Sequence, residues 1–135
     1  MKRILWVVLG AVVFATGCSD PVAPIAPTPV VPTVTDTFSD TLLVLGSNTH
    51  PFTVATIGGV KVSLTSVTPS AAVGLGIGTP NGLGSCTVID HVETVAGPSV
   101  QLSGTATVPG GYCVVIFDLG NLVEPAAYTI NVLHS

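Results

Sequence analysis

The feature that most constrains the fold of this chain is the two-residue period of its apolar side chains, which begins near Thr35 and continues to the end of the sequence. Val60, Val62 and Leu64 alternate with polar residues, as in a strand that buries one face. No later stretch shows a helical period. Short alternating segments separated by Gly, Pro, Ser and Asn predict an all-β fold, an antiparallel β-sandwich of jelly-roll or Greek-key type with about eight strands.

Two of the expected strands have unusual compositions. In residues 73–78 the apolar residues alternate with glycines, so another backbone or a large side chain is expected close to the glycine face. Residues 112–117 are apolar on both faces and predict the central strand of a sheet. The Gly58-Gly59 pair predicts a hairpin turn. The expected strands are residues 38–45, 50–57, 60–65, 73–78, 86–92, 100–108, 112–117 and 128–132.

The first residues have the layout of a bacterial export signal. Lys2 and Arg3 precede an apolar run, and small residues lead to Cys18. Thr16-Gly17-Cys18 resembles a lipobox, in which the cysteine receives a diacylglycerol and, after cleavage, an acyl chain such as palmitate. We therefore expect a signal peptide over residues 1–17, a lipid-anchored linker over 18–35 and one domain over 36–135. The alternative is an ordinary cleaved signal with an incidental cysteine.

This anchor predicts that the chain contacts a membrane through lipid and lies in the bacterial cell envelope. Ser19 follows the cysteine and Asp20 comes one place later, a pattern that favours the outer membrane over inner-membrane retention. Five prolines between residues 21 and 32 predict an extended polyproline segment that acts as a spacer.

The charge balance narrows the possible partners. The formal net charge of −4 includes Lys2 and Arg3, so the chain after the predicted cleavage carries −6, with Lys61 as its one basic side chain. Such a chain has no surface for phosphate backbones, so nucleic acid is excluded as a partner, as is attraction to anionic lipid. An envelope or extracellular polymer, or a protein, remains as the expected partner.

Cys86 and Cys113 remain once Cys18 is assigned to the lipid. In an exported protein a disulfide between them is the expected state. Two buried thiols or a metal pair are the alternative, although no CxxC motif or nearby histidine completes a ligand set.

Catalytic and metal-binding patterns were sought in the polar residues. Ser85, His91 and either Asp90 or Glu93 form a hydrolase triad on paper, but the segment before Cys86 lacks a nucleophile elbow. His50 and His134 stand far from His91 in sequence. The aromatic residues occupy core-like positions, which lowers the prospect of sugar binding.

Acidic residues offer one further arrangement. Asp118 and Glu124 flank the connection before the last strand and, together with Asp40, would make a weak oxygen site. None of the acidic residues has the spacing of a calcium loop, so solvated loop carboxylates and turn caps are the simpler interpretation. We expect no catalytic residue, no metal ligand and no cofactor.

Several strands resemble the bacterial pre-peptidase C-terminal domain. The similar segments include the Phe38-Ser39-Asp40 strand, the His50–Val54 strand, the Gly111–Val115 segment and the closing Tyr128–Val132 strand. The resemblance implies a non-catalytic β-sandwich associated with export or substrate adhesion, in some members with calcium. Here residues 71–75 replace the acidic strand of that family, which puts calcium binding in doubt.

These observations predict a non-catalytic, lipid-anchored β-sandwich of the cell envelope that serves as a binding, adhesion or accessory module. Two alternatives remain open at this point. One is a small hydrolase or metal-dependent enzyme with a site in the loops, and the other is an inert structural surface protein.

Overall fold

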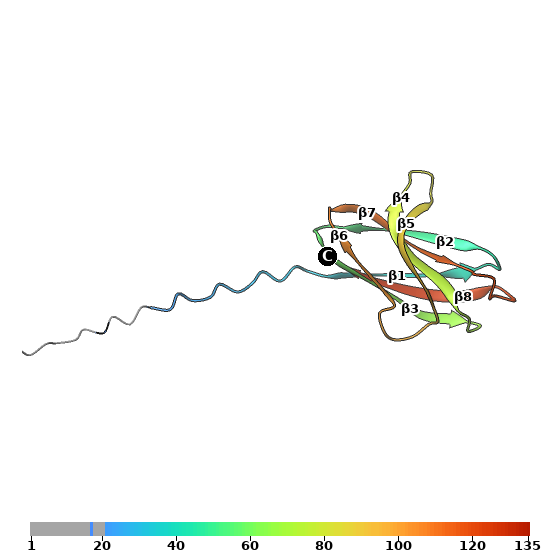
Figure 1. The fold of residues 1–135 in the computed structure, drawn as a ribbon, viewed down its shortest axis with the longest axis horizontal. Helices are drawn as coiled ribbons and strands as arrows, with labels where there is room; N and C mark the ends of the chain where they lie inside the picture. The colour runs from blue at the N-terminus through green and yellow to red at the C-terminus, as the bar shows by residue number, and fades with distance from the viewer. Residues whose placement is uncertain (1–16, 18–20) are drawn as a thin grey trace, which may run out of the picture.

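The computed structural model describes Gly17 and residues 21–135 (Figure 1). Apart from Gly17, the predicted signal peptide lies outside the described residues, and so does Cys18. Residues 21–33 are exposed and contain neither helix nor strand. The described part of the chain contains no helix that is long and apolar enough to span a membrane.

The chain from Val34 onward forms eight strands, as the alternating pattern predicts. Their bounds are β1 (Val34–Leu42), β2 (Ser47–Val54), β3 (Gly58–Thr68), β4 (Val73–Pro80), β5 (Cys86–Thr94), β6 (Leu102–Ala106), β7 (Gly110–Phe117) and β8 (Ala126–His134).

The strands form two four-stranded sheets in which every pair is antiparallel. The first sheet has the order β1-β8-β3-β6 and the second has the order β2-β7-β4-β5. Only β4 and β5 are neighbours both in sequence and in a sheet, so every other connection crosses between the sheets. This order is that of a jelly roll, which confirms the predicted all-β sandwich and selects one of its two expected topologies.

The core lies between the sheets and is built from the apolar residues of each alternating strand. On β3 these are Val60, Val62 and Leu64, each at most 1% exposed. On β7, Val114 and Ile116 face them from the second sheet, where β7 lies between β2 and β4 as the prediction of a central strand requires. Burial of this apolar area is the main stabilising term of the fold.

Two sequence predictions near the turns are wrong. The apolar pattern predicts a first strand that continues through Leu45, but β1 ends at Leu42 and a tight turn follows. The Gly58-Gly59 pair predicts a hairpin turn, but both glycines open β3, which lies in the opposite sheet from β2. In both cases the local residue pattern is compatible with either state, and the pairing partner decides.

The glycine face of β4 is close-packed, as expected. The Phe117 ring lies over Gly74, where an added Cβ would come within 2.2 Å of a ring carbon. At Gly78, an added Cβ would lie 2.0 Å from the backbone oxygen of Thr87. The bulge that interrupts the pairing of β4 with β5 falls between Ile77 and Gly78.

The sandwich has two ends with different contents. The N-terminal segment enters β1 at what we call the proximal end, where loops 55–57 and 107–109 and the end of β8 also lie (Figure 1). Strand direction assigns the 81–85 loop to this end as well, although it projects from the top of the domain in the view of Figure 1. Loops 43–46, 69–72 and 118–125 lie at the opposite, distal end, whereas residues 95–101 run along the edge of β3, where the Gly97 and Gln101 amides donate to the Leu64 and Val62 carbonyls. Alternation of strand direction fixes this division, so the distal loops point away from the linker.

Candidate functional site

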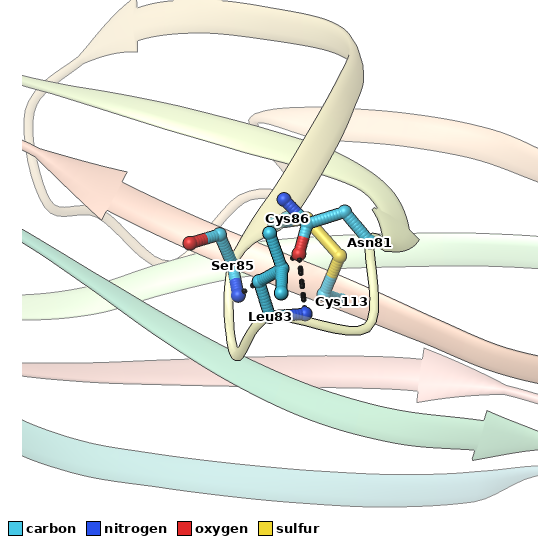
Figure 2. The surroundings of a disulfide bond; sticks show 5 residues. All are labelled: Asn81, Leu83, Ser85, Cys86 and Cys113. Carbon is cyan, nitrogen blue, oxygen red and sulfur yellow. Dashed lines mark hydrogen bonds between the residues drawn. A yellow bond between two sulfur atoms is a disulfide. The ribbon is translucent and has the colours of Figure 1, made fainter.

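The predicted disulfide is present at the proximal end (Figure 2). Cys86 begins β5 and Cys113 lies on β7, on either side of β4, with an S–S distance of 1.99 Å and a Cα–Cα distance of 5.9 Å. Beside the disulfide, Asn81 Oδ1 accepts hydrogen bonds from the Leu83 and Ser85 amides at 3.0 and 3.3 Å. This pair is a structural crosslink, and the thiol and metal-pair alternatives do not apply.

The hydrolase triad does not assemble. Ser85 lies in the loop before β5, whereas His91 lies six residues further along that extended strand, a separation of about 20 Å at about 3.3 Å per residue. Asp90 accepts a hydrogen bond from the His91 backbone amide rather than from its ring. The His91 ring instead lies near Phe117, with 6.4 Å between centroids.

The carboxylate of Asp118 is occupied by backbone amides. Its Oδ2 accepts from the Leu45 amide at 2.8 Å, and its Oδ1 accepts from three amides of its own loop, those of Gly120, Asn121 and Leu122, at 2.9, 2.9 and 3.1 Å. The Leu45 amide, more than the other three, holds the pKa of Asp118 below its ordinary value. Among the described residues no group of three or more His, Cys, Asp or Glu side chains could hold a metal, so Asp40, Asp118 and Glu124 form no oxygen site.

The structure brings His50 and His134 to the side of the sandwich where β1 faces β2. His50 Nε2 lies 2.6 Å from Tyr128 Oη, and its ring stacks on Phe38 at 4.8 Å. Burial lowers the pKa of His50, an effect partly offset by the charge of Asp40. His134 Nε2 lies 2.9 Å from Asp36 Oδ2.

Sequence reasoning missed this grouping because the partners are far apart in the chain, 78 residues for His50 and Tyr128. The polar atoms of the cluster partner one another, and His134 is 3% exposed, whereas the Asp36 side chain is 37% exposed. The cluster lies along the β1–β2 side of the core, where Tyr128 and Asp36 engage one ring nitrogen each of His50 and His134.

A crevice opens on the opposite side, between β5 and β6. It has a volume of ≈ 80 Å³, with Ile77, Ile89 and Ala106 among its apolar walls and Asp90 at its edge. The Tyr112 hydroxyl, also in the wall, donates to the Val108 carbonyl at 2.9 Å. Ligand pockets are typically about 300 Å³ or larger, so this crevice is too small for a sugar ring.

Loops at both ends expose large aliphatic side chains, at the proximal end Ile57, Leu83 and Val108, one in each of three loops, and at the distal end five residues in two loops. We use "distal loops" for the β1–β2 turn, residues 43–46, and the β7–β8 loop, residues 118–125. Their exposed large aliphatic residues are Leu43, Val44, Leu45, Leu119 and Val123. Val123 is 95% exposed and Leu45 is 77% exposed.

Hydrogen bonds join the two distal loops to each other. Asp118 accepts from the Leu45 amide, and the Asp118 amide donates to the Gly46 carbonyl at 3.0 Å. Within the turn, the Gly46 amide donates to the Leu43 carbonyl at 2.9 Å, and Leu45 has a φ of 55°. The sequence does carry a signal, since Leu42-Leu43-Val44-Leu45 is continuously apolar, but the same run is also typical of a buried strand.

Comparisons with known proteins place the fold but not a family. No protein-family model and no curated protein matches the chain in sequence, so the resemblance to the pre-peptidase C-terminal domain is not confirmed. The Yersinia pseudotuberculosis-derived mitogen superposes with a TM-score of 0.54 at 14% identity, covering 76% of this chain and 86% of the mitogen.

A second solved structure is similar at the same level. PliG from Aeromonas hydrophila, a periplasmic inhibitor of g-type lysozyme, superposes with a TM-score of 0.51 at 10% identity, covering 73% of this chain and 83% of PliG. Both neighbours are bacterial proteins, and neither is described as an enzyme. At these identities the comparison establishes a shared β-sandwich fold.

Proposed function

We propose that this chain is a non-catalytic binding module of the bacterial cell envelope, held to a membrane by lipid on Cys18 and spaced from it by the proline-rich segment. The observation that carries the proposal is the pair of distal loops, which present large aliphatic side chains to solvent at the end opposite the linker. Exposed apolar groups gathered in one place are typical of interaction sites.

Three further observations support this function over the alternatives. The triad residues are separated along β5, the carboxylate of Asp118 is used by backbone amides, and the β5–β6 crevice is small. These disfavour a hydrolase or metal-dependent enzyme. An inert structural protein would gain nothing from aliphatic side chains in rigid, exposed loops. The disulfide and a periplasmic neighbour support an oxidising, extracytoplasmic location.

The tether is tested by the intact mass of protein extracted from membranes, compared with a Cys18→Ser variant and measured with and without reductant. We expect the mass of the chain from Cys18 plus three acyl groups, less two hydrogens for the disulfide. The variant is expected in the soluble fraction. An unacylated, soluble wild-type chain would overturn the lipid anchor.

Binding is tested separately by hydroxyl-radical footprinting of the protein on intact cells and in purified form. A partner protects part of the surface on cells, whereas an inert protein gives the same footprint in both states. Because one structural neighbour is an inhibitor of g-type lysozyme, that enzyme is the first purified protein to assay for binding.

A further inference from the structure

Leu45 occupies a backbone position at which the fold would be better served by a residue other than leucine. It is the third residue of the tight turn 43–46, and its φ of 55° falls in the left-handed region. Gly and Asn are the usual residues there, because this conformation brings a Cβ close to the following carbonyl oxygen, and only the short polar side chain of Asn offsets that by local hydrogen bonds. The Leu45 side chain is 77% exposed, so it recovers little of that strain by packing.

The hydrogen bond of the Leu45 amide does not explain why the residue is a leucine either. Asp118 accepts a hydrogen bond from the Leu45 amide, and almost any residue supplies an amide. An exposed apolar side chain held in a strained conformation indicates a role outside the folded domain. The strain is tolerated because Asp118 holds the turn at two points: its carboxylate accepts from the Leu45 amide, and its own amide donates to the Gly46 carbonyl.

The same hydrogen bonds prepare the distal loops for binding. One carboxylate accepts four backbone amides from two loops, so the loops are ordered before any partner arrives. A preordered surface loses less conformational entropy when it binds. The aliphatic side chains of Leu45 and Val123 project from this ordered base into solvent.

The charges around the distal loops select the partner. Asp40, Asp118 and Glu124 lie in or beside these loops, and Glu93 is near the distal end of β5. Lys61, the one basic side chain of the described residues, pairs in register with Leu133 toward the proximal end. The distal end therefore combines exposed aliphatic side chains with four of the six carboxylate residues of the segment 36–135.

Like charge disfavours three possible occupants of this surface. An anionic bilayer and a nucleic acid are repelled by the carboxylates, and a second copy would place the same acidic groups opposite one another. An apolar pocket edged by cations would match both the exposed aliphatic side chains and the carboxylates of the distal end. Resting on the proposed binding function, we propose that the distal loops insert Leu45 and Val123 into an apolar pocket, edged by Lys and Arg side chains, on a partner protein.

The test is photo-crosslinking on living cells of the native bacterium, using full-length protein with p-benzoylphenylalanine in place of Leu45 or, separately, Val123. The matched control carries the same group in place of Leu83, which is 87% exposed in a loop at the proximal end. We expect one protein adduct from the two distal positions and none from the control. Mass spectrometry is expected to map the adduct to apolar residues flanked by Lys or Arg.

The partner protein identified by crosslinking is then purified. Its affinity for the wild-type chain is compared with its affinity for two variants. Leu45→Asn suits the turn better and is expected to raise the melting temperature by about 3 °C while weakening binding at least tenfold. Leu83→Asn is expected to leave binding unchanged. Raising the salt concentration is expected to weaken binding further, as charge complementarity requires.

The outcomes separate this proposal from the general binding function. Adducts to lipid or to a second copy, or binding that survives Leu45→Asn, would overturn the distal-loop proposal. Footprint protection confined to another surface would also overturn it while leaving the binding function standing. Identical footprints on cells and in solution, with no adduct, would reject both.

Discussion

The two ends of the sandwich are made rigid in different ways. At the proximal end a disulfide joins β5 to β7, and the chain terminus is bound by the backbone of the 55–57 loop, where the Ala55 amide donates to the Ser135 carbonyl at 2.8 Å. At the distal end one carboxylate orders two loops through four amides. The proximal end therefore has a covalent crosslink, whereas the distal loops have none and are held by two main-chain hydrogen bonds and by the four amides that donate to one ionised side chain.

The largest expected effect comes from removing the proximal crosslink. Replacing both cysteines, by Cys86→Ala and Cys113→Ala, opens a loop of 27 residues. The chain-entropy model then predicts a loss of about 3.5 kcal/mol of unfolding free energy. Urea denaturation with and without reductant measures it. A loss below about 1 kcal/mol would show that the sheets alone hold this end.

Replacing a glycine by alanine is also expected to lower the unfolding free energy more at the proximal end than at the distal end. At Gly78, which pairs with Cys113, an alanine Cβ would meet the Thr87 carbonyl oxygen at 2.0 Å. We expect Gly78→Ala to cost about 3 kcal/mol, because this neighbour is backbone and cannot move aside. In the distal loops Gly120 has a φ of 90° but open space around it. Gly120→Ala should therefore cost about 1 kcal/mol from strain alone.

Gly59→Ala is the control for this pair. Its added Cβ meets nothing within 4 Å, so the unfolding free energy should change by less than about 0.5 kcal/mol. If Gly120→Ala proved as costly as Gly78→Ala in thermal and urea unfolding, the distal loops would be as tightly packed as the proximal sheet, and the contrast between the ends would fail.

The smallest effect on global stability is expected from the distal carboxylate. Hydrogen bonds lower the pKa of Asp118 from its ordinary value of 3.8. The folded state therefore favours the charged form, so the ordering it provides is complete above pH 3.8 and is lost as the pH falls through the lowered folded-state pKa. Nitrogen-15 relaxation should show the Leu45 and Gly120 amides becoming mobile in that range.

Asp118→Asn is expected to mobilise the same amides at neutral pH while the core strands β3 and β7 stay rigid. The cost to the melting temperature should be smaller than that of Gly120→Ala, because only the exposed loops lose their order. Unchanged relaxation in this variant would mean that the turn from Leu43 to Gly46 holds itself without the carboxylate.

The sequence predicts the strands well wherever one face is buried. β3 and β8 follow their alternating residues closely, and the both-face apolar pattern of β7 identifies the centre of a sheet. The disulfide is predicted because the expected export places the two remaining cysteines in an oxidising compartment, where a disulfide is their usual state. These features depend on local composition or on the redox environment, and both can be read without knowing how the strands pair.

Features that depend on pairing are not predictable in this way. The Gly58-Gly59 pair is compatible with a hairpin turn and equally with the start of β3. Only the placement of β2 and β3 in different sheets excludes the hairpin. Leu43 to Leu45 fits a strand until Asp118, 73 residues away from Leu45, accepts its amide. The sequence expectation that Phe117 belongs to the core was incorrect in detail, because its ring covers Gly74 on the outer face of the second sheet.

The course of β1 has a mechanical consequence under the proposed tether and the proposed distal partner, which would hold the molecule at one end and load it at the other. The N-terminal segment enters β1 at Val34, and nine residues later the same strand delivers the chain to the distal turn. Nine extended residues span about 30 Å and cannot lengthen much under tension. A pull between the linker and Leu45 would therefore run along a single taut strand, in shear against the antiparallel β8, without unzipping the sandwich.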